Sequence, residues 1–292
     1  MGTANHTMAL SLWRFEKLRR DLDWFSYWFV FSSLFMGGVF LLFFPSVLNV
    51  FLREDSIAET SGAIFLFLTS IVLFCCSCGI YRDSGLKAKK DQIRLILFFF
   101  AGLAFFWAAG EEISWGQRIF DISTPERLAK LNQQKELNLH NLNTLFFNNG
   151  LETIILLAIL VPSIYRIKGK ERILGIILPS YSVILGFQLV SCYVTYSYMK
   201  PQDYLSYLML AVLLISFHSH RDWTRMEQVF LNFILIIFLA VVNIHLRKSF
   251  PSNGPREFRE YLFSFLCFVY SIEIALDMRK SCLSVKSGYP IY

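Results

Sequence analysis

Residues 24–44 read WFSYWFVFSSLFMGGVFLLFF, a run of twenty-one residues without a charged side chain. As a helix this run is about 30 Å long, which matches the hydrocarbon core of a bilayer. A second uncharged, mainly apolar run covers residues 229–244. The two runs predict membrane-spanning helices, and they set the fold class of the chain.

The composition of the whole chain agrees with this prediction. Of its 292 residues, 55% are hydrophobic and 17% are charged, and the mean hydropathy is +0.47. Soluble domains carry about 25% charged residues. The composition therefore excludes a soluble enzyme, a disordered chain and a nucleic-acid-binding module. We expect membrane lipids among the partners of the chain, and no nucleic acid.

Eight apolar segments predict an all-α fold, a polytopic transmembrane helix bundle over residues 24–278. Two of these segments are short, and the fifth is long and contains Pro179. The segments are Trp24–Phe44, Gly62–Tyr81, Ile93–Ala109, Leu151–Tyr165, Ile173–Tyr198, Tyr204–Phe217, Val229–Leu246 and Tyr261–Leu276.

The basic residues indicate the orientation of this bundle. If the N-terminus is cytoplasmic, 18 of the 28 Lys and Arg residues fall in cytoplasmic segments. Because cytoplasmic loops of membrane proteins carry an excess of Lys and Arg, this bias favours two cytoplasmic termini, residues 1–23 and 279–292. The net charge of +6 is thus interpreted as a topology signal.

The one long connection, residues 110–150, faces outward in this topology. Connections of this length are usually functional or disordered. Ser123, Pro125 and Glu126 form a helix-start signal, because Ser and Glu three residues apart make a capping box and proline suits the first turn. The apolar residues that follow predict an interfacial amphipathic helix. The Asn-Asn-Gly sequence at 148–150 predicts a turn into the fourth span.

The densest polar cluster is GEEISWGQR at residues 110–118. If the third helix continues through it, the spacing i, i+3, i+4 and i+7 places four side chains on one face: Glu111, Ser114, Trp115 and Arg118. Two adjacent carboxylates at a membrane boundary are costly unless they are paired, hydrated or bound to metal. One could act as an acid while the other stays ionised. The alternative is an interfacial helix end with Trp115 in the aromatic belt.

A second polar cluster, NQQKELNLHN, occupies residues 132–141. Amides and an imidazole suit a site that orients a polar headgroup or a metal-bound water, and the alternative is a solvated loop. The predicted topology brings Asn243 and His245, at the outer end of the seventh span, to the same side. Histidines and carboxylates are ligand types for zinc or another divalent metal, although no HExxH spacing supports such a site.

These clusters define the candidate site. The candidate catalytic residues are Glu111, Glu112 and His140. The candidate metal ligands are His140 and His245. The candidate substrate-binding residues are Ser114, Trp115, Gln117, Arg118, Asn138, Asn141 and Asn243. We expect a carboxylate, Arg118, His140 and either Asn243 or His245 to converge on one outward-facing cavity, since carboxylates just outside an apolar span need hydrogen-bond donors.

The string AGEEISWGQRIF, followed by TPE and NQQKELNLHNLN, covers residues 109–143. This signature resembles that of a family of uncharacterised bacterial multi-pass inner-membrane proteins. The resemblance implies a bacterial inner-membrane location. It implies no catalytic role for any residue, because no activity is associated with the family.

One carboxylate, Glu273, falls inside the last apolar segment, with Asp277 four residues on. A carboxylate at membrane depth is a functional hypothesis in general. The interpretation favoured by the sequence is a helix end that frays into the interface, where Arg279 and Lys280 pair with the acids.

Three classes of function fit these observations. The first is a membrane enzyme, a hydrolase or transferase, that acts on a lipid or lipid-linked substrate. The second is a non-catalytic assembly subunit that docks a membrane-protein partner through the loop at residues 110–150. A transporter is disfavoured, because the sequence has no inverted repeat and few charges deep in its spans. The enzyme is the favoured interpretation.

Overall fold

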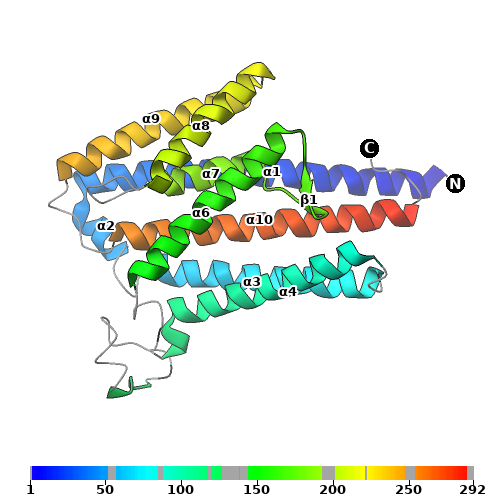
Figure 1. The fold of residues 1–292 in the computed structure, drawn as a ribbon, viewed down its shortest axis with the longest axis horizontal. Coiled ribbons are helices and arrows are strands. Elements are labelled where there is room, and N and C mark those ends of the chain that lie inside the picture. The colour runs from blue at the N-terminus through cyan, green and yellow to red at the C-terminus, as the bar shows by residue number, and fades with distance from the viewer. Residues whose placement is uncertain are drawn as a thin grey trace.

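A computed structural model of the chain shows how these segments pack. The structure describes residues 2–51, 57–84, 88–117, 120, 122–126, 138, 144–192, 201–220, 222–246 and 254–287. It is helical almost throughout these ranges (Figure 1). The long helices are α1 (Gly2–Phe43), α3 (Ile57–Ser84), α4 (Lys89–Glu112), α6 (Thr144–Ile167), α9 (Trp223–Leu246) and α10 (Gly254–Ser287). The shorter ones are α2 (Pro45–Phe51), the 3₁₀ turn η1 (Ser114–Gly116), α7 (Tyr181–Cys192) and α8 (Pro201–Ser219).

The chain is a helical membrane protein. Within the described residues, six helices are long and apolar enough to cross a bilayer. They contain the candidate spans Trp13–Phe43, Ile57–Arg82, Lys89–Glu112, Asn149–Ile167, Trp223–Val242 and Glu257–Cys282. Two further apolar segments, Tyr181–Ser191 and Leu205–His218, are shorter.

The predicted span at residues 173–198 is wrong as a single helix. Its first part is a two-residue hairpin, in which β1 (Arg172–Ile173) pairs antiparallel with β2 (Ile176–Ile177). The two turn residues, Leu174 and Gly175, both have positive φ, 53° and 79°. This is the geometry of a type I′ turn, the tight turn whose twist matches that of the strands it joins.

The helix α7 that follows this hairpin lies at the centre of the bundle. Residues 182–190 are all buried, and α7 packs against α1, α6, α8, α9 and α10. The start of α7 is capped, because the backbone N–H of Val183 donates to Ser180 Oγ at 3.3 Å. At 1.5 Å per residue, the described part of α7 is about 18 Å long.

Hydrogen bonds between helices tie the core together. The hydroxyl of Tyr27 in α1 donates toward two oxygens of α9, the carbonyl of Gln228 at 2.9 Å and Oδ1 of Asn232 at 3.0 Å. Asn232 in turn donates to the carbonyl of Leu185 in α7 at 3.2 Å. Such bonds hold helices together where lipid removes the hydrophobic driving force for association.

The helices α3, α4 and α10 form a second layer (Figure 1). Ser70 and Ser77 of α3 donate to backbone carbonyls of α4, those of Gly102 and Leu95. The outer face of α4 exposes large apolar side chains, including Phe100. In a membrane this face contacts lipid.

The start of α1 and the end of α10 lie at the same end of the bundle (Figure 1). Residues 2–23, predicted as a cytoplasmic segment, are helical and continuous with the first span. Most residues of the predicted cytoplasmic tail continue α10, which ends at Ser287. The opposite end of the bundle holds the end of α4 and the start of α10, where the candidate site lies.

Candidate functional site

The third span does not continue as a helix through the GEEISWGQR cluster. Instead α4 ends at Glu112, and Ser114, Trp115 and Gly116 all have positive φ, at 46°, 54° and 74°. The left-handed conformation costs roughly 1–2 kcal/mol at each non-glycine residue. The predicted face shared at i, i+3, i+4 and i+7 is therefore wrong.

The turn nevertheless folds Trp115 back onto the end of α4. Its indole Nε1 donates to Oε1 of Glu111 at 2.8 Å, and its ring lies edge-on to Trp107, with 5.0 Å between the ring centroids. A Cβ atom at Gly110 would lie 2.8–2.9 Å from three carbon atoms of this ring. Gly110 is thus what lets the indole reach Glu111, a buried carboxylate.

The predicted substrate-binding residues of this segment bond to other polar side chains. Ser114 is buried and its Oγ accepts a hydrogen bond from Nδ2 of Asn138, also buried, at 3.1 Å. Nε2 of Gln117 donates to Oγ1 of Thr124. These contacts hold the residues that follow α4 close to its end. This direct hydrogen bond brings Ser114 and Asn138 together.

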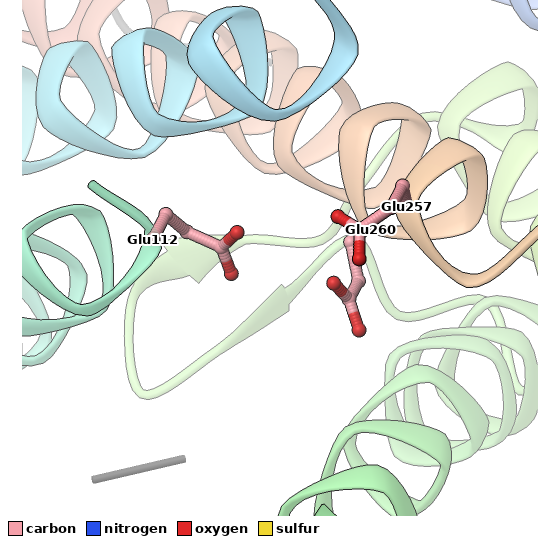
Figure 2. Close-up of side chains that lie close together, drawn as sticks. All are labelled: Glu112, Glu257 and Glu260. Atoms are coloured by element: carbon pink, nitrogen blue, oxygen red, sulfur yellow. The ribbon is translucent and has the colours of Figure 1, made fainter. Parts of the chain in front are cut away.

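The other carboxylate, Glu112, points toward α10 (Figure 2). Oxygen atoms of Glu112, Glu257 and Glu260 all lie within 4.8 Å of one another. Glu257 is buried, with 5% of its surface exposed, and the other two are half-buried. Arg259, the residue before Glu260 in the chain, pairs with Glu152 of α6 at 3.2 Å. Carboxylates of α4 and α10 therefore meet at an acidic site.

This acidic cluster has a definite chemical capacity. Like charges this close repel, so such groups are stabilised by a shared proton, a cationic side chain or a metal ion. A carboxyl group that exchanges a proton can act as a general acid or base. Three carboxylates also make up a ligand set for a hard divalent cation such as Mg²⁺ or Ca²⁺.

The sequence prediction missed Glu257 and Glu260. It began the last span at Tyr261, whereas α10 begins at Gly254. The signal that would have found them is their spacing of three residues, which places both carboxylates on one face of a helix at the outer end of the span.

Several predicted site residues lie outside the described residues. These are Arg118, His140 and Asn141, together with the side chains of Asn243 and His245 at the end of α9. The predicted convergence of these groups with Glu111 or Glu112, and the predicted histidine metal ligands, remain predictions. The predicted interfacial helix also falls largely outside, since residues 127–137 are not described.

Two other expectations are corrected. The Asn-Asn-Gly sequence at 148–150 is no turn, because α6 begins at Thr144 and includes it. Glu273 is no frayed helix end, since its side chain is completely buried and accepts a hydrogen bond from the backbone N–H of Ser180 at 3.0 Å. Asp277 pairs with Arg172 of the hairpin through two hydrogen bonds, at 2.5 and 2.6 Å.

Comparison of the chain with protein-family models, with curated proteins and with solved structures gives no match.

Proposed function

We propose that the chain is a membrane enzyme, a hydrolase or transferase, that acts on a lipid or lipid-linked substrate. The reaction would take place where the ends of α4 and α10 meet. The observation that carries the proposal is the convergence of Glu112, Glu257 and Glu260 from two helices. Placing carboxylates at a membrane boundary costs free energy, and such groups are concentrated at functional sites.

In this proposal the two types of carboxylate have different tasks. Glu112 and Glu260 are half-buried and so accessible to a substrate, and they transfer the proton. Glu111, which is held by the indole of Trp115, fixes the geometry of the turn. A divalent cation at the three carboxylates would bind the phosphate of a lipid headgroup and polarise it.

The site would face away from the cytoplasm. The basic helix ends, among them the start of α1 and the end of α10, lie at the opposite end of the bundle. The positive-inside rule assigns that end to the cytoplasm and leaves the acidic site outside. With the family resemblance, this orientation favours a bacterial inner membrane with both termini inside.

The experiment compares lipids in cells that overproduce the full chain. We expect a lipid species to be consumed or formed with the wild type, and this change to be absent with Glu112→Gln and Glu260→Gln at equal expression. Glu126→Gln is the matched control, because Glu126 is an exposed carboxylate on the segment that follows α4. A lipid profile that is the same for all four proteins would refute the enzyme.

The alternative is an assembly subunit that docks a membrane-protein partner through the same segment. It is favoured by the exposed apolar side chains of Phe120 and Ile122, which follow the turn. In that case a partner co-purifies in mild detergent, and Phe120→Ser abolishes its association while Glu112→Gln does not.

A further inference from the structure

A second polar site lies at the opposite end of the bundle from the acidic cluster. It is a cavity of about 350 Å³ lined by residues 16–23 of α1, the end of α6, the starts of α7 and α9, and the C-terminal part of α10. Five of its lining side chains are basic and only two are acidic. The basic residues are Arg19, Arg20, Arg166, Arg225 and Lys280.

The two acidic residues are already engaged with cations. Asp23 pairs with Arg225 at 2.7 Å, and Glu16 pairs with Lys280 at 2.9 Å. Within the part of the chain that the structure describes, Arg19 and Arg20 form no ion pair. The cavity therefore holds an excess of positive charge, which an anion would balance.

Two of the guanidinium groups are held in fixed positions. Arg166 donates from Nε to the carbonyl of Pro179 at 2.8 Å and from Nη2 to that of Leu178 at 3.0 Å. The groups of Arg166 and Arg225 lie over the ring of Tyr181, at 5.0 and 6.0 Å from its centroid. Arginines fixed in this way lose little side-chain entropy when they bind a ligand.

The start of α7 also borders the cavity, since Ser180 and Tyr181 line it. The N-terminal end of a helix carries a partial positive charge that favours anions. Here the backbone N–H of Ser180 already donates to the buried carboxylate of Glu273, at 3.0 Å. The arginine side chains are therefore the groups that would bind an anion in this cavity.

We propose that this cavity binds a phosphate group, supplied either by the headgroup of an anionic phospholipid or by a soluble phosphorylated compound. Guanidinium groups match the oxygen atoms of phosphate in geometry as well as in charge. The cavity lies toward the end of the bundle that holds the start of α1 and the end of α10, the end assigned to the cytoplasm, where headgroups of the inner leaflet and soluble phosphates are both present. The site is separate from the acidic cluster and does not rest on its proposed function.

The test uses the full chain purified in dodecyl maltoside, a neutral detergent, and isothermal titration with two probes. The probes are dihexanoyl phosphatidylglycerol and inorganic phosphate. The test variant is the double substitution Arg19→Gln and Arg20→Gln. Its matched control is Lys89→Gln with Lys90→Gln, which removes two exposed charges at the same end of the bundle but outside the cavity.

We expect at least one probe to bind the wild type, the arginine variant to weaken that binding tenfold or more, and the lysine variant to weaken it less than twofold. Binding of the lipid alone identifies a headgroup as the source, and binding of phosphate alone identifies a soluble compound. A further variant, Arg166→Lys, keeps the positive charge but loses the two hydrogen bonds to the carbonyls of Pro179 and Leu178. It should weaken binding severalfold. The proposal is overturned if neither probe binds, or if the arginine and lysine double variants bind alike.

Discussion

The substitution Gly110→Ala tests how the turn after α4 is held. A Cβ atom there would lie 2.8–2.9 Å from three carbons of the Trp115 indole, whereas carbon atoms in contact are about 3.5–4.0 Å apart. The indole ring would have to move away from residue 110 by roughly 0.7 Å. It would then lengthen or lose its 2.8 Å hydrogen bond to Glu111.

The expected change in stability follows from three contributions. Overpacking costs about 1–3 kcal/mol, and a lost hydrogen bond to a charged group costs about 1.5–3 kcal/mol. Alanine in place of glycine within a helix returns roughly 0.5–1 kcal/mol. Because 39% of the surface of Trp115 is exposed, the ring can move, so the low ends of these ranges apply. We expect Gly110→Ala to lower the free energy of unfolding by about 2 kcal/mol.

The assay is unfolding of the full chain in mixed micelles by sodium dodecyl sulfate, followed by circular dichroism. Gly150→Ala is the matched control, since a Cβ there meets nothing within 4 Å and alanine should stabilise α6 by about 0.5–1 kcal/mol. In a Trp115→Ala background the cost of Gly110→Ala should disappear. If Gly110→Ala is as stable as Gly150→Ala, the packing of the indole on Gly110 is refuted.

Three further predictions use the same purified chain or intact cells. Asp277→Asn should lower the free energy of unfolding by about 1–3 kcal/mol, because it leaves the guanidinium of Arg172 without its carboxylate. Glu16→Gln, at the exposed pair with Lys280, should change it by under about 1 kcal/mol, and equal effects of the two substitutions would contradict the pairing of Asp277 with Arg172. Tyr27→Phe should cost about 1 kcal/mol through the lost bonds to α9, and an unchanged midpoint would show that these bonds contribute nothing. In a cysteine-free background, Glu126→Cys should react with an impermeant maleimide in intact cells and Lys89→Cys only after permeabilisation; the reverse would overturn the orientation.

Hydropathy was enough to predict the long helices, because the length of an apolar run measures directly whether it can cross a bilayer. It failed at residues 173–177, where isoleucine-rich sequence is as apolar as a helix but folds as a hairpin. Hydropathy averaged over a stretch of sequence says nothing about the backbone angle φ. Gly175 was the one residue whose type indicated the turn. The failure has a physical basis, since apolar strands and apolar helices have the same composition.

The site was predictable in part. Glu112 stood out because two acidic residues follow an apolar run. Its partners Glu257 and Glu260 depend on α4 and α10 being neighbours, and the sequence of either helix alone does not contain that contact. The left-handed turn was also hidden, because Ser114 and Trp115 are ordinary helix residues and Gly116 was the only local signal.

The central helix α7 has a consequence for biogenesis. Its buried polar side chains, among them Ser182 and Gln188, would lie in hydrocarbon if the helix were released sideways into lipid on its own. It reaches its place only when the other helices enclose it, and one of these, α10, leaves the ribosome later than α7 does. An element from the middle of the chain therefore waits for a helix made after it before the core around it is complete.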